Sequence, residues 1–381
     1  MPSWRGYLAV VGLVGVIDTA FLLGIISGYA KKLGAGDAEA GFIAGLYSMV
    51  AIPASLLAGA LVDAIGRRRS LSIGLAWDTA SMILYGVVDD YRGLAMVRGL
   101  HAVGGSLVYP AYMAIVGDSS PRDRRGREAG RYLAVVALAV ALGSLTSSII
   151  VHELGFKPAL RLIALIVFAG FIASLRIPET RPRREAMRGL EGQLSHVIHS
   201  AATILLLYIG FGAIIGGMPQ ALLNQGLVGV EEEASAITGA IIGIASLASI
   251  PAFIIAGRLT DIRGPAATLA LGGALVVISQ LAILGSTSIY TMMAAAIPYG
   301  AAIAAVMTVS TFMAISVEGA RGSSVAIQQI ANIAGVAVGA PLGGVLAGMK
   351  AVTGVALAVA STGVLLLLYS NTLRSLASSE V

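Results

Sequence analysis

The stretch of sequence that decides the fold is Gly59-Ala60-Leu61-Val62-Asp63-Ala64-Ile65-Gly66-Arg67-Arg68-Arg69. An apolar segment ends there in an acidic residue, and a glycine and three arginines come before the next apolar segment. A second copy stands 198 residues later, as Gly257-Arg258-Leu259-Thr260-Asp261-Ile262-Arg263-Gly264. Neighbouring residues repeat in the same register, including the pairs Gly41/Gly239, Gly45/Gly243, Ser48/Ser246, Pro53/Pro251 and Gly74/Gly272. The chain is therefore a tandem repeat, and a repeat of this length organises the whole fold.

The composition is that of an integral membrane protein. Of 381 residues, 57% are hydrophobic and 12% are charged, whereas soluble domains carry about 25% charged residues. The chain has no cysteine, which excludes disulfides, thiolate metal sites and cysteine nucleophiles. The net charge of +5 comes from arginines between hydrophobic segments, so it indicates membrane topology and no nucleic-acid partner.

The apolar segments predict twelve membrane-spanning helices, because a span needs about 20 mostly apolar residues. The expected helices cover residues 5–29, 41–62, 70–88, 93–117, 129–151, 159–176, 197–223, 235–256, 266–285, 289–315, 324–347 and 351–370. Each repeat holds an even number of spans, so the two halves run in the same direction. We therefore expect an amino-terminal six-helix bundle over 1–176, a cytoplasmic linker over 177–195 and a carboxy-terminal bundle over 196–381.

The basic residues predict the orientation. Of the 25 lysines and arginines, 18 lie in loops on the side of the amino terminus and 6 lie on the opposite side. Cytoplasmic loops carry the excess of basic residues. We therefore expect a multi-pass protein of the cytoplasmic (inner or plasma) membrane, with both termini in the cytoplasm.

The loop that repeats resembles a signature of the major facilitator superfamily of secondary transporters. The matching residues are Gly59, Leu61, Asp63, Gly66, Arg67 and Arg68 in the first copy, and Gly257, Leu259, Asp261 and Gly264 in the second. Further similar motifs are Arg98-Gly99 with Gly104-Gly105, Asp118-x-x-Pro121-x-x-x-Arg125-Gly126, and Pro178-Glu179-Thr180-Arg181. The resemblance covers nearly the whole chain. It implies a fold of two six-helix bundles that transports a solute by alternating access.

The acidic residue of the repeated loop is expected to act as a conformational latch. A carboxylate at a helix end can accept hydrogen bonds from free N–H groups at a neighbouring helix start and can pair with an arginine. The alternative is that the arginines only satisfy the positive-inside rule. The expected latch residues are Gly59, Asp63, Gly66, Arg67, Arg68, Arg125 and Asp261.

Ionisable residues inside the spans are candidates for proton coupling, because they are costly in a membrane. The resemblance implies that the first, fourth, seventh and tenth helices line a central cavity, which Asp18 and Arg98 would then face. We hypothesise that Asp18 binds the coupling proton and that Arg98 is its counter-charge; the alternative is a static ion pair. Asp78 lies on a helix expected to be peripheral, where a structural hydrogen bond is the favoured role. On the fourth helix His101, Tyr109 and Tyr112 share one arc with Arg98 at about 100° per residue.

The spans of the second half offer neutral polar groups in place of charges. The expected cavity residues there are Gln220, Asn224, Tyr299, Gln328 and Asn332. A dianionic cargo would need two buried cations, and only Arg98 is available in the expected cavity. This division favours a neutral or cationic, fairly apolar solute.

The sequence therefore predicts a secondary active transporter that is driven by a proton gradient and works as a monomer in the lipid bilayer, and not an enzyme. No cofactor or metal is expected, and His196 and His199 are expected at a solvated helix end. One alternative is an uncoupled facilitator of sugar or metabolite uptake. Another is a receptor or membrane-embedded enzyme on the same scaffold.

Overall fold

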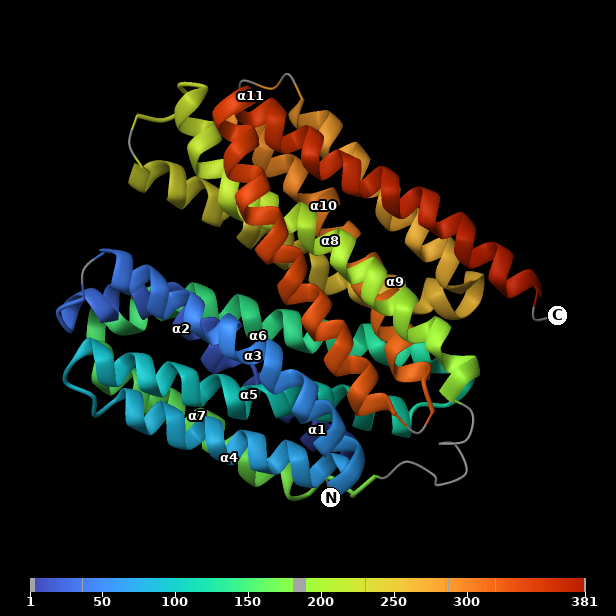
Figure 1. Cartoon of the computed structure of the whole chain (residues 1–381), viewed down its shortest axis with the longest axis horizontal. Helices are drawn as coiled ribbons and strands as arrows, with labels where there is room; N and C mark the ends of the chain where they lie inside the picture. Colours follow the sequence, from blue (N-terminus) through green and yellow to red (C-terminus); the bar gives the residue numbers. More distant parts are fainter. Residues whose placement is uncertain are drawn as a thin grey trace. The chain divides into compact units, whose positions relative to one another are not determined.

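The computed structural model describes residues 4–35, 37–180, 190–229, 231–284, 286, 288–318 and 320–379. Within these residues the secondary structure is helical, without strands. Part of the expected linker over 177–195, namely residues 181–189, lies outside the described residues. The elements (Figure 1) are α1 (Trp4–Val14), α2 (Ile17–Lys32), α3 (Asp37–Ile65), α4 (Arg67–Tyr85), α5 (Tyr91–Ser119), η1 (Arg122–Arg124), α6 (Arg125–Leu154), α7 (Phe156–Ser174), α8 (Leu190–Asn224), α9 (Glu231–Ile283), α10 (Ile289–Ser316) and α11 (Arg321–Ser379).

These elements correspond to the twelve expected helices, and the all-helical membrane fold is confirmed. α1 and α2 together occupy the first expected span. α9 contains two expected helices joined at Gly264, and α11 contains two joined at Ala351, since both residues leave the helical conformation. The remaining expected spans each match one helix of the described chain.

The backbone breaks follow the sequence repeat. Gly66, between α3 and α4, has a φ of 111°, and Gly264, at the equivalent place in the second copy, has a φ of 83°. Positive φ is readily available to glycine and costly for other residues. The repeated glycine therefore ends one helix and starts the next in both copies.

The chain divides into two compact units, each of which includes a short segment from the other half of the sequence. Unit 1 comprises residues 1–119, 135–193 and 317–327, and unit 2 comprises residues 120–134, 194–316 and 328–381. The boundaries 1–176, 177–195 and 196–381 that the sequence indicates stay a prediction.

Each unit has its own helix packing and core. In unit 1, α4 packs against α5 and α7, and α3 packs against α5 (Figure 1). The face of α4 turned inward buries Leu71, Leu75 and Met82 completely. In unit 2, α9 packs along α10, and a core cluster joins Leu222 of α8 to Met292 of α10 and other apolar residues.

Eight segments of the described chain are long and apolar enough to cross a membrane. Two of them, Ile237–Ile283 and Arg321–Leu373, have 47 and 53 residues, which is enough for two crossings each at about 20 residues per span. α4 is not among the eight, since it begins with three arginines and carries Asp78 in its interior.

Candidate functional site

Asp63, at the end of α3, holds the start of α11 within unit 1. Its Oδ1 accepts a hydrogen bond from the N–H of Gly322 at 3.0 Å. Its Oδ2 accepts bonds from the N–H of Ser323 at 2.8 Å and from the Ser323 hydroxyl at 2.7 Å. The first N–H groups of a helix have no partner inside the helix, and the helix dipole favours a negative charge there. Asp63 therefore binds the start of α11 as an anion would.

Gly59 allows this approach, because a side chain there would collide with α11. A Cβ atom on Gly59 would lie 2.7 Å from the Cβ of Ala326 and 2.9 Å from the Cα of Ser323. Both distances are far shorter than ordinary contacts between carbon atoms. Gly59 and Asp63 lie one helical turn apart, so one face of α3 offers a surface without a side chain next to a carboxylate.

A buried arginine connects this contact to a second carboxylate. The side chain of Arg67 is fully buried, with Nη2 at 2.9 Å from Asp63 Oδ1 and Nε at 3.1 Å from Asp118 Oδ2. Asp118 also forms an ion pair with Arg321 of α11. Two acids and two arginines therefore alternate in one charge network at the loop end of unit 1.

The second copy of the motif repeats the arrangement inside unit 2. Asp261 accepts hydrogen bonds from the N–H groups of Gly126 at 2.8 Å and Arg127 at 2.9 Å, at the start of α6. Here Gly257 provides the bare surface, since its Cβ would lie 2.5 Å from the carbonyl oxygen of Gly126. Arg125, the first residue of α6, is buried. The two copies are reciprocal: each carboxylate binds the start of the fifth helix of the other repeat.

Glu179 is a residue that the sequence motifs contained but to which we assigned no role. Its carboxylate accepts hydrogen bonds from the N–H groups of Arg68 at 3.0 Å and Arg69 at 3.2 Å. It therefore caps the start of α4, directly after the turn at Gly66. Arg68 itself is about one-third exposed and lies 3.9 Å from Glu179.

Asp18, Asp78 and His101, which we call the buried triad, meet inside unit 1 from α2, α4 and α5. Their side chains are at most 2% exposed. The Nε2 of His101 lies 3.2 Å from Asp18 Oδ2 and 3.8 Å from Asp78 Oδ1. The three ligand atoms lie within 4.8 Å of one another, a spacing that could also hold a metal ion.

Arg98 of α5 is also buried, but it forms no ion pair with Asp18 among the described residues. Its guanidinium lies over the ring of Tyr47, with 4.8 Å between Cζ and the ring centroid. The rings of Tyr47 and Tyr85 also face His101 edge-on, at 5.2 and 5.8 Å between centroids. The sequence did not indicate these two tyrosines, since their helices reach the triad only through packing.

Of the other expected residues of α5, Tyr112 points to α1 within unit 1. Tyr112 is 2% exposed, and its hydroxyl fills the space where a Cβ on Gly12 would stand. Tyr109, one turn earlier, is half-buried.

In unit 2 the expected cavity residues fall into two groups. Gln220 donates to Asn224, which donates to the carbonyl oxygen of Ala347 at 3.0 Å, near the end of α8. Gln328 donates to the hydroxyls of Ser310 and Thr311 at 2.8 and 3.0 Å.

Tyr299 and Asn332 both lie near Tyr208 of α8, a residue that sequence reasoning missed. Tyr299 is buried, and its hydroxyl has no hydrogen-bond partner among the described residues. The oxygen of the Gln328 amide is likewise buried without a partner there. A buried polar atom without a partner can form a hydrogen bond with a polar group of a ligand or with a water molecule.

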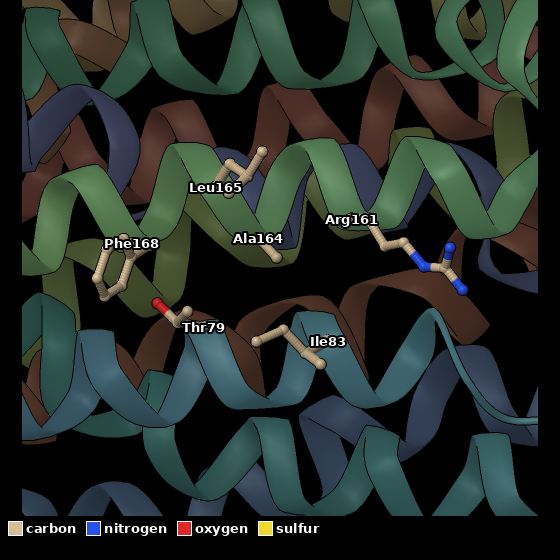
Figure 2. Close-up of a pocket in the computed structure, with 6 residues that line it drawn as sticks. All are labelled: Thr79, Ile83, Arg161, Ala164, Leu165 and Phe168. Carbon is tan, nitrogen blue, oxygen red and sulfur yellow. The ribbon is translucent and has the colours of Figure 1, made fainter.

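A cavity of about 400 Å³ between α4 and α7 is apolar and lies apart from these residues (Figure 2). Its lining consists of Thr79, Ile83, Arg161, Ala164, Leu165 and Phe168. Ile83, Leu165 and Phe168 are all more than 45% exposed, and exposed apolar side chains of a membrane protein face lipid. We therefore assign this cavity to the lipid-facing surface.

A comparison with known families identifies the class of the protein. The model of the Major Facilitator Superfamily matches residues 8–320. The chain belongs to this superfamily of transporters, and the match agrees with its all-helical fold and repeated loop. The fold and the family indicate a transporter and not an enzyme.

Individual relatives are distant. Multidrug resistance protein 3 of Bacillus subtilis (strain 168) is 28% identical over 145 residues, which are 38% of this chain and 28% of that protein. The chain thus matches less than two thirds of that relative's length. The inner membrane transport protein YajR of Escherichia coli (strain K12) is 22% identical over 381 residues, which cover 96% of this chain and 82% of YajR.

Two solved structures share the fold. The human organic anion transporter MFSD10 (TETRAN) superposes with a TM-score of 0.77 at 13% identity, covering 97% of this chain and 100% of that chain. The proton:xylose symporter XylE superposes with a TM-score of 0.75 at 14% identity, covering 96% of this chain and 94% of that chain. At these identities the likeness concerns the fold alone.

Proposed function

We propose that this protein is a proton-driven secondary transporter that moves a small neutral or cationic, largely apolar solute by alternating access. The observation that carries the proposal is the reciprocal latch, in which Asp63 binds the start of α11 and Asp261 binds the start of α6. The same contact between a carboxylate and the start of a helix occurs in both copies of the repeat, which supports one latch in each copy.

The strength of the latch suits a contact that opens and closes. A hydrogen bond to a charged group contributes about 1.5–3 kcal/mol net, so the bonds accepted by Asp63 amount to several kcal/mol. Conformational states of a working protein differ by a few kcal/mol. Each latch is therefore strong enough to hold one state and weak enough for a solute or proton to release it.

The distribution of charge supports a proton as the driving ion and a neutral or cationic solute as the cargo. Ionisable side chains are buried together in unit 1, whereas Gln328, Tyr299 and Asn332 of unit 2 offer neutral polar groups. Neutral donors and acceptors fit an uncharged or cationic apolar solute better than a dianion. The relative from Bacillus subtilis is named for multidrug resistance, which supports a drug-like organic solute.

The topology completes the proposal. The excess of basic residues in one set of loops supports a topology with both termini in the cytoplasm and the protein in the cytoplasmic membrane. One chain carries both repeats with all the residues invoked here, so a monomer suffices for function.

The experiment that tests the cargo is a thermal-unfolding panel on detergent-purified protein. The probes are tetraphenylphosphonium and ethidium as lipophilic cations, xylose as a sugar, and citrate as an organic anion. A ligand at 100 times its Kd stabilises by about 2.7 kcal/mol, which shifts the unfolding temperature measurably. We expect stabilisation by a lipophilic cation and weaker stabilisation of Gln328→Leu. Stabilisation by citrate alone would contradict the proposed solute class.

Flux into proteoliposomes separates this function from an uncoupled facilitator. With the stabilising compound as the probe, a pH gradient is expected to drive accumulation above the external concentration. Equilibration to equal concentrations, at the same rate with and without the gradient, would establish the facilitator instead.

A further inference from the structure

The buried triad contains one nitrogen atom that faces two carboxylates. His101 Nε2 is within hydrogen-bond distance of Asp18 Oδ2 at 3.2 Å, whereas Asp78 Oδ1 lies beyond it at 3.8 Å. An N–H on this nitrogen can therefore serve one carboxylate at a time, and in this structure it serves Asp18. The two acids of the triad are thus not equivalent.

The surroundings of Asp18 stabilise its ionised form. The helix is interrupted between α1 and α2, and Asp18 lies in the first turn of α2. The helix dipole favours a negative charge there. Its Oδ1 accepts a hydrogen bond from the N–H of Thr19 at 2.6 Å, and its Oδ2 interacts with His101. A carboxylate with a bond at each oxygen is compensated for its burial.

Asp78 lacks such compensation at one of its two oxygens. It is 1% exposed, in the interior of α4, and its Oδ1 has no hydrogen-bond partner among the described residues. An isolated ionised carboxylate is very costly in such a place, and a buried acid avoids the cost by keeping its proton.

The remaining charges around the triad lead to the same assignment. Tyr47 from α3 and Tyr85 from α4 face His101, and Arg98 from α5 lies over the ring of Tyr47. Arg161 of α7 lies at the far end of α4, where it donates to the carbonyl oxygen of Gly86. With Asp18 ionised, Arg98 protonated and His101 neutral, the buried groups are neutral in sum only when Asp78 carries a proton.

The second nitrogen of His101 argues for a neutral imidazole. Nδ1 is buried and has no hydrogen-bond partner among the described residues, so an imidazolium would leave an N–H unsatisfied there. A metal-bound histidine normally donates its other N–H to a carboxylate or carbonyl, and that partner is missing in the described surroundings as well. The triad therefore fits a proton better than a metal ion.

We propose that Asp78 carries the exchangeable proton, that Asp18 remains an ionised anchor, and that His101 switches its N–H between them. When the O–H bond of Asp78 breaks, the electron pair stays on the oxygen, solvent water accepts the proton, and a second buried carboxylate forms. The Nε2–H of His101 then turns from Asp18 to Asp78, and no other group changes its protonation. A role for this proton in transport rests on the proposed proton-driven function, but the assignment itself can be tested without transport.

The test is infrared spectroscopy of the purified full-length protein at neutral pH, with aspartate labelled by carbon-13. A protonated aspartate gives a C=O stretching band above the amide region, which ionised aspartates do not. We expect this band in the wild type and in Asp18→Asn, and its loss in Asp78→Asn. Asp89→Asn is the matched control, because the Asp89 side chain is 87% exposed, and it is expected to keep the band.

Two results would overturn the assignment: absence of the band in the wild type, or its loss in Asp18→Asn with persistence in Asp78→Asn. A second measurement needs neither variant to fold. The chain has only four histidines, so nitrogen-15 NMR resolves His101, assigned by its loss in His101→Gln. A neutral ring protonated at Nε2 supports the proposal, and an imidazolium at neutral pH contradicts it. If the band behaves as expected but no solute moves protons, the proposed function fails and the assignment stands.

Discussion

Replacing Asp63 by asparagine is expected to release the start of α11. The carboxylate accepts three hydrogen bonds from Gly322 and Ser323 at 2.7–3.0 Å and pairs with Arg67 at 2.9 Å. Asparagine keeps one acceptor oxygen, places an NH₂ group against a donor, and removes the charge. Since a hydrogen bond to a charged group contributes about 1.5–3 kcal/mol, we expect a loss of about 2–3 kcal/mol for the closed contact.

Hydrogen–deuterium exchange reads this loss directly, because two of the affected donors are backbone amides. Local opening governs exchange of such amides, and each 1.4 kcal/mol is a factor of ten. The Asp63→Asn variant should therefore exchange the peptide containing Gly322 and Ser323 about 30- to 150-fold faster. Amide exchange there at the wild-type rate would show that Asp63 does not hold this helix start.

The second copy supplies a matched control. Asp261→Asn should accelerate exchange at Gly126 and Arg127, whose amides bond to Asp261 at 2.8 and 2.9 Å. If each variant also accelerates the other peptide, the two latches open in one transition. If each affects only its own peptide, they open independently.

Three further changes probe other contacts. Gly59→Leu should open the latch as Asp63→Asn does, because its Cβ would lie 2.9 Å from the Cα of Ser323; normal exchange at Ser323 would contradict this. Glu179→Gln should lower the free energy of unfolding by about 1 kcal/mol, since it weakens a charged cap at the start of α4; an unchanged unfolding temperature in detergent would argue against a capping role. Gln328→Leu should weaken ligand stabilisation about tenfold in apparent Kd, as expected for a lost hydrogen bond of about 1.4 kcal/mol, and an unchanged Kd would exclude Gln328 from the solute site.

Much of the fold could be predicted from the sequence, because hydrophobicity and repetition are local properties of the chain. The spacing of 198 residues between the two loops located the equivalent turns at Gly66 and Gly264. The long helices α9 and α11 were each expected as two, and the breaks at Gly264 and Ala351 mark the joints. The break between α1 and α2 was not expected, since the apolar segment that contains it is continuous.

The site was less accessible to sequence reasoning, because it depends on how helices are rotated against one another. Asp18 was expected to face Arg98, but the structure brings it to His101, which lies one turn after Arg98 on α5. Asp78 was placed at the periphery because of the position of its helix in the family fold. Its side chain instead joins the triad through the packing of α4 against α5. Two glycines mark that close packing in the sequence: a Cβ on Gly74 would lie 3.1 Å from the carbonyl oxygen of Gly104, and a Cβ on Gly104 would collide with the ring of Trp77.

Proton-driven transport can be measured as solute-evoked proton movement in proteoliposomes that contain a pH-sensitive dye. The solute is the compound that stabilises the purified protein most in the thermal panel. We expect that adding it changes the internal pH for the wild type and for Asp89→Asn, and that Asp78→Asn gives no change. Solute accumulation without any proton movement in the wild type would contradict proton-driven transport.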